Sequence, residues 1–314
     1  MKEIKKKLAK YYKYLILYKY YIKKISFSEK SQRKKIIVCF DGNVPHGGLV
    51  DRLKGIVSFY EISKLIHSDF KILFDHPFEL ESFLIPNVIN WKINKTEIKY
   101  TIFSTKIIYL INEFNTNPLD LIKKTKAKTI LIYCNVDYLP ILYKEKNGLE
   151  INAIWRKSYL ELFKPSDYLL SNIVNLPKGK RIVIHTRFTS LMGDFKDTTK
   201  IELKNQEKYI LIEKVVSKIE EISKEYPELI KYILSDSEMF LNYIRANTIY
   251  ETVDGVPYHL ENNNNRSKEY HLKTFLDFYF IIESDTVYFV KIDQMYNSNF
   301  SKYASIIGNT KFIS

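Results

Sequence analysis

Short uninterrupted apolar runs alternate with longer amphipathic stretches along most of this chain. In the first half, apolar runs bounded by turn residues predict buried strands at residues 36–40, 70–74, 107–111 and 129–133. Helical spacing of apolar positions predicts a helix with one apolar face, made by Leu49, Leu53, Ile56, Val57 and Tyr60. This alternation is typical of an α/β fold with a mostly parallel sheet.

The second half repeats the alternation after a helical stretch at 151–173, which breaks before Pro165 and is expected to link the halves. Strands are predicted at 181–184, 232–234 and 286–290, and helices at 205–225, at 270–283 and from about Ser301. A short helix is also expected from Pro77 to about residue 84. We therefore divide the chain into a segment 1–35 and two domains, 36–175 and 176–314, with ligands expected at the carboxyl ends of their strands.

Charge separates the N-terminal segment from the rest of the chain. The net charge is +13, and residues 1–35 carry 13 Lys or Arg against Glu3 and Glu29, or +11, which leaves +2 for residues 36–314. A nearly neutral body argues against nucleic acid as a partner, because nucleic-acid enzymes usually carry a basic stripe through their folded domains. The two cysteines, Cys39 and Cys134, lie in apolar runs and are expected to be buried thiols in a reducing compartment.

Residues 1–35 interleave lysines with tyrosines and aliphatic residues. They lack the continuous apolar region of a secretory signal, and their apolar stretch at 14–18 is far shorter than the roughly 20 residues of a transmembrane helix. Tyrosine favours the lipid headgroup region, and lysine favours anionic lipid. Two interpretations stay open for a cytoplasmic protein: a peripheral anchor on the anionic inner membrane face, or a solvated basic helix packed loosely on the body.

Two polar segments of the second half could bind an anion. An apolar strand delivers His185 and Arg187 at its carboxyl end, where Arg can grip a diphosphate and His can bond a base, a ribose or a phosphate. The last helix is preceded by small polar residues whose backbone N–H groups can bind an anion: Ser298, Asn299, Phe300 and Ser301. Taken singly, an ordinary polar strand end and a plain helix cap are the simpler interpretations.

Three further features place polar or flexible residues at positions that need an explanation. Asp236 follows a strand between two serines, where it can accept hydrogen bonds from a guanine edge or cap a helix. Asp277 lies among apolar residues, so it must face a ligand cleft or cap a neighbouring backbone. Gly47 and Gly48 open a helix and either admit a ligand close to the backbone or form a tight turn, but they match neither GxxxxGK[ST] nor GxGxxG.

Together these features resemble the fucosyltransferase superfamily over residues 36–314. They occur in the order GGLVDRLKG, a His-x-Arg strand end, a Ser-Asp turn, and Asp277 followed by S-N-F-S. The superfamily includes α1,6-fucosyltransferases, the nodulation fucosyltransferase, bacterial α1,2-fucosyltransferases and protein O-fucosyltransferases. The resemblance implies a GT-B fold, with two Rossmann-like αβ domains facing across a cleft, the acceptor side first and the nucleotide-sugar side second.

The resemblance also implies a role for each donor-site residue. Arg187 would bind the β-phosphate and the glycosidic oxygen, while His185 and Asp236 would contact guanine or ribose of a GDP-sugar. The diphosphate would be held by Ser298, Asn299, Phe300 and Ser301. Asp277 would stabilise the donor loop.

Other positions follow or depart from the family pattern. Gly47 and Gly48 would line the cleft. The family often reads H-x-R-x-x-D, whereas this chain carries Ser190 at the Asp position, and Asp194, four residues further on, is the candidate replacement.

No D-x-D pair occurs, so no metal is expected on the diphosphate, and fixed positive charge at Arg187 would stabilise the departing GDP. The expected reaction is direct inverting transfer of fucose from GDP-fucose to a hydroxyl of a surface glycan, such as a lipid-linked one. Base candidates are His46, Asp51 and Asp194. The alternatives are a transferase of the same fold with another nucleotide sugar, and a non-catalytic polysaccharide- or nucleic-acid-binding protein.

Overall fold

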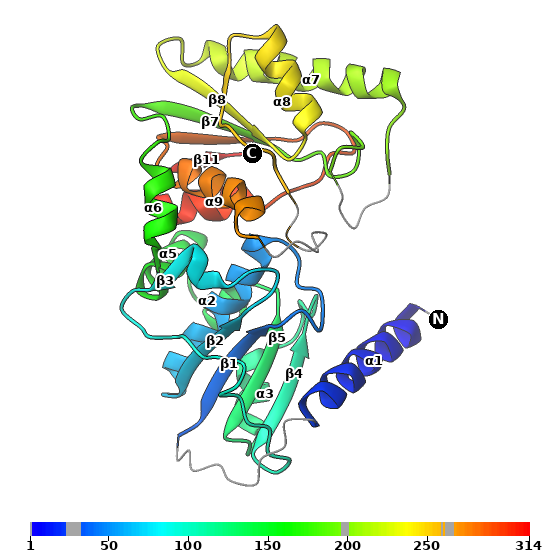
Figure 1. Cartoon of the computed structure of the whole chain (residues 1–314), viewed down its shortest axis with the longest axis vertical. Helices are drawn as coiled ribbons and strands as arrows, with labels where there is room; N and C mark the ends of the chain where they lie inside the picture. Colours follow the sequence, from blue (N-terminus) through cyan, green and yellow to red (C-terminus); the bar gives the residue numbers. More distant parts are fainter. Residues whose placement is uncertain (1, 23–32, 196–200, 259, 261–266) are drawn as a thin grey trace. The chain divides into compact units, whose positions relative to one another are not determined.

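A computed structural model describes residues 2–22, 33–195, 201–258, 260 and 267–314, and the expected segment 1–35 therefore lies partly outside the described residues. The chain forms two compact units: Met1–Glu81 with Ile85–Lys164, and Ser82–Leu84 with Pro165–Ser314 (Figure 1). We call them unit 1 and unit 2. The division falls at residue 165, whereas the sequence places the second domain from 176.

Unit 1 is built on a parallel sheet with the strand order β2–β1–β5–β4. Its strands are β1 (Lys35–Phe40), β2 (Asp69–Phe74), β4 (Thr105–Leu110) and β5 (Thr129–Cys134). β5 is buried along its whole length, which explains why its sequence is a continuous apolar run. Cys39 and Cys134 are buried free thiols, as expected from the sequence, and burial raises the pKa of the Cys134 thiol to about 12.

The helices of unit 1 are α1 (Lys2–Ile22), α2 (Leu49–Leu65), α3 (Pro118–Lys124), α4 (Leu139–Leu142) and α5 (Gly148–Leu162). The sequence predicts one apolar face on α2, but the buried surface of this helix extends well beyond that face. Between Leu49 and Ser63, only Asp51 and Lys54 are partly exposed, because α2 packs against both the sheet and α5. Its buried polar residues are bonded instead of solvated: the Glu61 carboxylate accepts hydrogen bonds from Ser158 and, at 2.6 Å, from Tyr143.

The helix expected after Pro77 is reduced to a single 3-10 turn, η1 (Leu80–Ser82). The chain then extends as β3 (Leu84–Pro86), which pairs with β6 (Phe163–Pro165). A short segment gains little from helix formation, because the first hydrogen-bonded turn is costly and only later residues repay it. Pairing with β6 therefore decides the structure of this segment.

Gly55 fixes how closely α2 approaches the sheet. A Cβ atom at this position would lie 2.5 Å from the backbone oxygen of Cys134, which cannot move aside as a flexible side chain could. We expect Gly55→Ala to lower the free energy of unfolding by about 1–3 kcal/mol, although alanine favours helices. Gly148→Ala is the matched control, because a Cβ there meets nothing within 4 Å. Urea unfolding curves test this, and equal stability of both variants would contradict it.

Unit 2 contains a fully parallel sheet with the order β11–β10–β7–β8–β9. Its strands are β7 (Arg181–Thr186), β8 (Ile230–Ser235), β9 (Glu251–Thr252), β10 (Thr286–Val290) and β11 (Lys311–Ile313). If β7, β8, β9, β10 and β11 are numbered 1 to 5, the order read from β9 to β11 is 3-2-1-4-5. This is the strand order of a doubly wound sheet. Chain direction around the sheet therefore reverses between β7 and β10, and ligands of such sheets bind at the carboxyl ends of these two strands.

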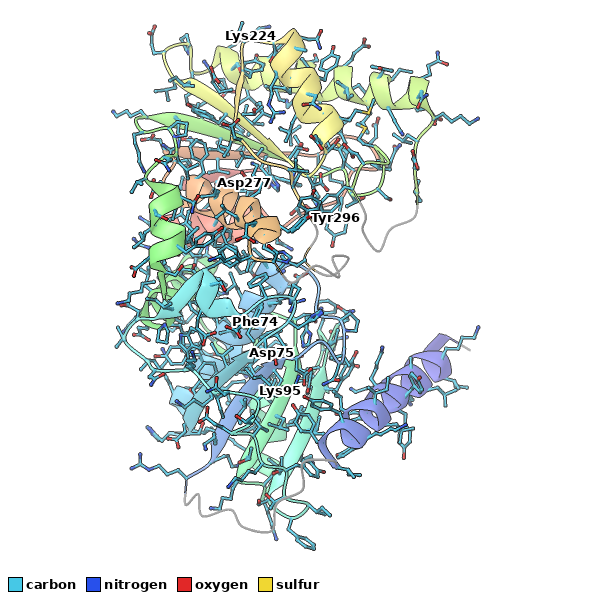
Figure 2. The ribbon with its side chains drawn as sticks, viewed as in Figure 1. Phe74, Asp75, Lys95, Lys224, Asp277 and Tyr296 are labelled. Atoms are coloured by element: carbon cyan, nitrogen blue, oxygen red, sulfur yellow. The ribbon has the colours of Figure 1, made fainter. Side chains whose placement is uncertain are left out.

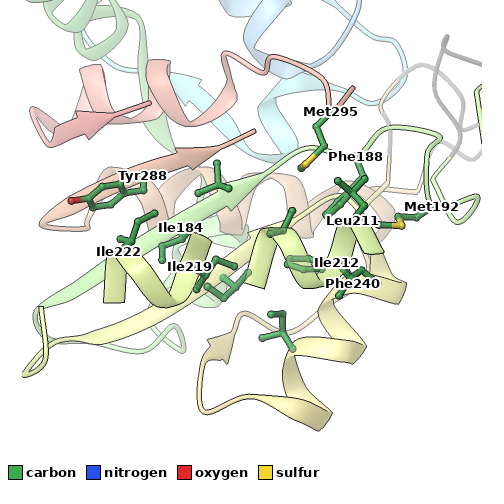
Figure 3. Close-up of a cluster of buried hydrophobic side chains, with 14 of the residues drawn as sticks. Ile184, Phe188, Met192, Leu211, Ile212, Ile219, Ile222, Phe240, Tyr288 and Met295 are labelled. Atoms are coloured by element: carbon green, nitrogen blue, oxygen red, sulfur yellow. The ribbon is translucent and has the colours of Figure 1, made fainter. Parts of the chain in front are cut away.

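The helices of unit 2 are α6 (Asp167–Ile173), α7 (Asn205–Lys224), α8 (Glu238–Asn247), α9 (Glu269–Ile282) and α10 (Phe300–Gly308). Figure 3 shows the core between α7, α8 and the sheet, a hydrophobic cluster that includes Ile184 of β7, Ile212 of α7 and Phe240 of α8. Successive strand residues face opposite sides, so Ile182 and Ile184 enter this core while His185 faces the α10 side.

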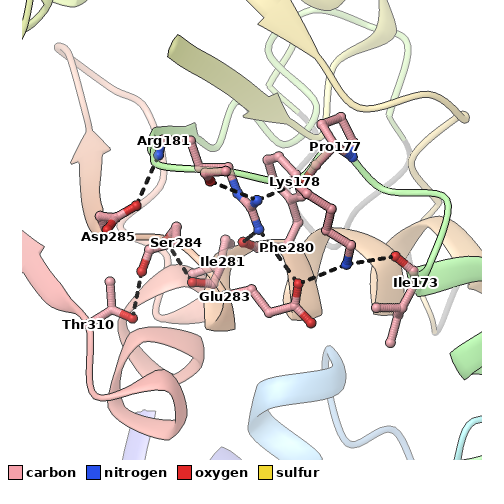
Figure 4. Close-up of polar contacts among 11 residues, drawn as sticks. Ile173, Pro177, Lys178, Arg181, Phe280, Ile281, Glu283, Ser284, Asp285 and Thr310 are labelled. Carbon is pink, nitrogen blue, oxygen red and sulfur yellow. Dashed lines mark hydrogen bonds and ion pairs between the residues drawn. The ribbon is translucent and has the colours of Figure 1, made fainter. Parts of the chain in front are cut away.

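The amino end of β7 is held by a buried arginine (Figure 4). Arg181 donates from Nη1 to the Pro177 oxygen at 2.8 Å, and its guanidinium lies 4.0 Å from the centroid of the Phe280 ring. The Arg181 backbone N–H bonds the Asp285 carboxylate at 3.0 Å, just before β10. These contacts fix β7 to α9 and β10, and so they fix the position of the polar residues at its other end.

Candidate functional site

Part of the predicted donor set, His185, Arg187 and Ser301, lies at the carboxyl ends of β7 and β10. His185 pairs in register with Phe289 of β10, and Arg187 follows directly after β7. The segment after β10 returns to this place, because the Tyr296 backbone N–H bonds the Arg187 oxygen at 3.2 Å. Figure 2 labels Tyr296 here, with Asp277 on the neighbouring α9. The structure thus brings residues that are more than a hundred positions apart in the sequence to the point where the strand order reverses.

His185 is buried and bonded to the last helix. Its Nδ1 lies 3.0 Å from the Ser301 hydroxyl, and its ring centroid lies 5.6 Å from that of Phe300. Burial, helped by the positive charges of Arg187 and Lys273, lowers the pKa of His185 to about 3. The imidazole is therefore neutral at physiological pH, so one ring nitrogen can donate a hydrogen bond and the other can accept one.

Arg187 is held by the buried carboxylate of Asp236. The Arg187 Nε lies 3.2 Å from Asp236 Oδ2, and its guanidinium lies 4.7 Å from the Phe195 ring centroid. Its side chain is 21% exposed, which leaves it accessible to a ligand from solvent. The Asp236 contact and the ring fix the plane of the guanidinium before any ligand arrives.

Asp236 also orders the turn that follows β7. Its two oxygens accept the backbone N–H groups of Phe188 and Thr189, both at 2.8 Å, and Thr189 adopts a φ of +56°. Burial raises the pKa of Asp236, while Arg187 and the two N–H groups oppose this shift. Because its oxygens bind Phe188, Thr189 and Arg187, the Asp236 carboxylate fixes the conformation of the turn that carries Arg187.

Asp194 and Ser237 connect the same turn to the start of α8. The Asp194 carboxylate accepts hydrogen bonds from the Ser237 hydroxyl at 2.9 Å and from the Met239 backbone N–H at 2.7 Å. Ser237, and not Asp236, caps the helix, because its hydroxyl accepts the Phe240 N–H at 3.1 Å. Asp194 thus stabilises a helix N-terminus.

The Ser298–Ser301 segment divides into a turn and a helix start. The Ser298 hydroxyl accepts the Phe300 N–H at 3.2 Å, and Asn299 occupies the N-cap position of α10 without a side-chain cap bond. Ser301 is not a cap, because its hydroxyl bonds His185. Backbone N–H groups at such a helix start favour anions.

Asp277 has a partner that the sequence analysis missed. It forms a buried ion pair with Lys273, one turn earlier on α9. Both side chains are almost fully buried, and burial raises the pKa of Asp277 while Lys273 opposes the shift. The i, i+4 spacing of Lys273 and Asp277 was the available signal.

The unit 1 candidates gather around the first turn of α2. His46 is 1% exposed, its Nδ1 lies 2.9 Å from the Val44 oxygen, and burial, helped by Arg52, lowers its pKa well below the ordinary range. Such a histidine is a weak proton acceptor. The Asp51 carboxylate is 40% exposed and lies 3.0 Å from the Lys54 Nζ.

The two glycines differ in what the backbone requires. Gly47 has a φ of +85°, and a Cβ there would lie 2.6 Å from the Asp51 carboxylate, so the tight turn needs glycine. Gly48 is the N-cap residue of α2, and a Cβ there would meet nothing within 4 Å. Gly48 therefore leaves open space at a helix N-terminus, while Gly47 shapes the turn.

The described residues contain no group of three or more His, Cys, Asp or Glu side chains that could hold a metal ion, and metal independence stays a prediction.

Burial of His185 should make the protein sensitive to acid. Its pKa of about 3 lies below the ordinary value of about 6.5, so between these values the unfolded chain binds more protons than the folded one. Its contribution to stability is complete above about pH 6.5 and falls as the pH drops towards 3, by up to about 1.4 kcal/mol per pH unit. We expect His185→Gln to flatten this decline in urea unfolding series. Parallel curves for the variant and the unchanged protein would contradict it.

Comparisons with known proteins identify the fold. No protein-family model matches the chain, and no curated protein matches it. A solved NodZ alpha-1,6-fucosyltransferase soaked with GDP-fucose is 14% identical, with a TM-score of 0.54 over 88% of this chain and 93% of that one. A mutant of Arabidopsis thaliana FUT1 in complex with GDP is 12% identical, with a TM-score of 0.57 over 94% of this chain and 74% of that one.

A further structure, the fucosyltransferase NodZ from Bradyrhizobium, is 13% identical with a TM-score of 0.52 over 87% of this chain and 92% of that one. At these identities the likeness lies in the backbone, and it extends over both units of the chain. The two parallel sheets, one in each unit, with their helices thus have the GT-B-like fold of the fucosyltransferase structures.

Proposed function

We propose that this protein is an inverting, metal-independent glycosyltransferase that transfers fucose from GDP-fucose to a hydroxyl of a surface glycan. The observation that carries the proposal is the position of His185 and Arg187 at the strand-order reversal of unit 2, bonded to Ser301 and Asp236. Supporting it, structures with GDP-fucose and with GDP share the fold of this chain.

In this proposal the donor diphosphate binds beside Arg187 and the N-terminus of α10. Both supply fixed positive charge, from the guanidinium and from the backbone N–H groups after Ser298. Lys273, although paired with Asp277, is close enough to His185 to help lower the pKa of the imidazole. The neutral imidazole of His185 serves as a hydrogen-bonding group for the nucleotide, not as an acid.

Asp236 receives a different role from the one that the family resemblance implies. Because its oxygens hold the Phe188 and Thr189 N–H groups and the Arg187 Nε, we assign it to positioning the arginine. Guanine then has to be recognised by other groups of unit 2. The same reasoning assigns Asp194 to the start of α8, where it is already bonded twice, in place of proton transfer.

The proposed reaction is a single displacement. The acceptor oxygen forms a bond to the anomeric carbon while the bond from that carbon to the β-phosphate oxygen breaks, and GDP leaves with the electron pair. Arg187 stabilises the charge that develops on this oxygen. The acceptor proton passes to a base, for which we propose Asp51, because it is a partly exposed carboxylate while His46 is buried with a lowered pKa.

The proposed acceptor is a glycan of the cell surface, such as capsule or lipopolysaccharide, carried on a lipid while it is built on the cytoplasmic side. Among the described residues, no helix combines the length and apolar character needed to cross a membrane. Transfer of fucose from GDP-fucose to a panel of lipid-linked glycans, followed by mass spectrometry, would identify the acceptor.

Nucleotide-dependent thermal stabilisation tests the donor class. We expect GDP, but not UDP or CMP at equal concentration, to raise the melting temperature, since a ligand at a hundred times its Kd stabilises by about 2.7 kcal/mol. Stabilisation by UDP or CMP would favour another nucleotide sugar. If no nucleotide stabilised the protein, the proposed glycosyltransferase activity would be contradicted. The remaining interpretation would then be a non-catalytic glycan-binding protein. GDP-mannose in place of GDP-fucose tests the sugar by the same mass-spectrometric assay.

A further inference from the structure

The N-terminal helix α1 carries an exposed apolar stripe. Its members follow at spacings of three, four and seven residues, and their exposed fractions are 63%, 64%, 69%, 55% and 53% for Ile4, Leu8, Tyr11, Leu15 and Ile22, respectively. Such spacings place them on one side of a helix. Single exposed apolar residues are common on proteins, but an aligned set on one helix is typical of an interaction surface.

A different face of α1 fixes the helix to unit 1. Leu17 and Tyr21 are fully buried, and the Tyr21 hydroxyl lies 2.9 Å from that of Tyr133 and 3.3 Å from the buried Asp41 carboxylate. The Tyr14 hydroxyl accepts the Tyr109 N–H of β4 at 3.1 Å. The helix is therefore an integral part of the unit 1 fold and not a loosely packed appendage.

Further contacts at its C-terminal end and its middle hold α1 in place. Lys95 lies 3.4 Å from the Asp75 carboxylate and 5.4 Å from the Tyr20 ring centroid. Figure 2 labels Lys95 and Asp75 in unit 1. Lys10 pairs with Glu113 at 3.1 Å. Because the packed face is fixed, the exposed stripe has one defined orientation on unit 1.

Lysines border the exposed stripe. At 3.6 residues per turn, Lys5 and Lys19 fall on one side of it and Lys7 on the other, and all three are exposed. An apolar strip between lysines matches an interface of headgroups and acyl chains, where the aliphatic stems lie along the apolar layer and the ammonium groups reach the phosphates.

We propose that α1 docks on an anionic lipid surface through Ile4, Leu8, Tyr11 and Leu15, with Lys5, Lys7 and Lys19 on the lipid phosphates. Charge decides the partner: anionic lipid complements the lysines, whereas a second copy of α1 would bring like charges together. The docked protein would then work next to membrane-held substrates.

Vesicle flotation with the full-length protein tests the proposal. We expect the protein to float with vesicles of phosphatidylcholine and phosphatidylglycerol but not with phosphatidylcholine alone, and to be released by 1 M salt, where the Debye length falls to about 3 Å. Removal of α1 is not used, because it would uncover Asp41 and Tyr133. Equal binding to both vesicle types, or binding to neither, would overturn the proposal.

Matched variants locate the surface. The triple change Lys5→Gln, Lys7→Gln and Lys19→Gln should weaken binding by about a hundredfold, since each lysine near an anionic surface contributes several-fold. Leu8→Gln with Leu15→Gln should also abolish flotation. The control triple variant has the same charge change on exposed lysines elsewhere in unit 1: Lys123→Gln, Lys124→Gln and Lys126→Gln.

The controls have to distinguish a lost lipid-binding surface from misfolding of the variants and from dimer formation. Unchanged thermal unfolding by circular dichroism would show that the variants fold. Equal loss of binding in the control triple variant would overturn the assignment to α1, and so would a dimer in sedimentation that Leu8→Gln dissociates. Flotation measures α1 and nucleotide stabilisation measures unit 2, so this inference and the proposed transferase activity can fail independently.

Discussion

Arg187→Ala is expected to lower transfer from GDP-fucose by about 10²–10³-fold, because a fixed donor of positive charge to the leaving diphosphate is lost. The ring of Phe195 and the carboxylate of Asp236 hold this guanidinium in a defined orientation before the donor binds, and alanine removes its charge and its donors together. Initial rates at saturating donor, measured by release of GDP, give the effect on kcat.

Two further variants test whether the geometry of Arg187 matters and whether its position matters. Arg187→Lys keeps the charge but loses the planar, two-pronged geometry, and it should recover only part of the rate. Arg245→Ala removes an exposed arginine of α8 in the same unit and should leave the rate within a few-fold. If Arg187→Ala retained activity at that level, Arg187 would not contact the leaving group.

Asp236→Asn is expected to reduce the free energy of unfolding by roughly 2–4 kcal/mol, because the amide cannot replace a buried charge that binds two N–H groups and an arginine. Activity should fall as well, since Arg187 loses its orientation. Urea unfolding and kinetic measurements on the same preparation test both effects. Asp254→Asn, on an exposed carboxylate of unit 2, is the control and should change neither.

The nucleotide preference of Asp236→Asn separates two roles for this residue. If Asp236 positions Arg187, the variant should still prefer GDP over UDP in thermal shift, although it binds GDP more weakly. If it reads guanine, the preference itself should disappear. The second outcome would restore the role that the family resemblance implies.

Most strands could be predicted because parallel strands buried on both faces have to be continuous apolar runs. β5 and β7 illustrate this, since both are buried throughout and both were expected from their sequence. The face pattern of α2 could not be predicted in the same way. Its polar residues Glu61 and Ser58 are buried because distant partners such as Ser158 and Tyr138 bond them.

Strand order illustrates a second limit. In unit 1, β5 lies beside β1, and β4 is at an edge of the sheet, although β4 comes earlier in the chain than β5. Local periodicity shows that a strand exists but not which strand it pairs with, because pairing depends on contacts between distant segments. Only after the order of unit 2 is known does the end of β7 stand out as the place where a ligand binds.

By itself, the sequence determined the alternation of strands and helices, the basic N-terminal segment and the polar residues His185 and Arg187 at a strand end. Local chemistry suffices for these, since periodicity, turn residues and charge act within a few positions. Tertiary structure decided that Ser301 bonds His185, that Asp236 holds Arg187 and that Lys273 neutralises Asp277. It also decided which face of α1 is buried. These outcomes depend on the burial of each polar group among distant partners, which costs free energy unless every charge and donor is matched.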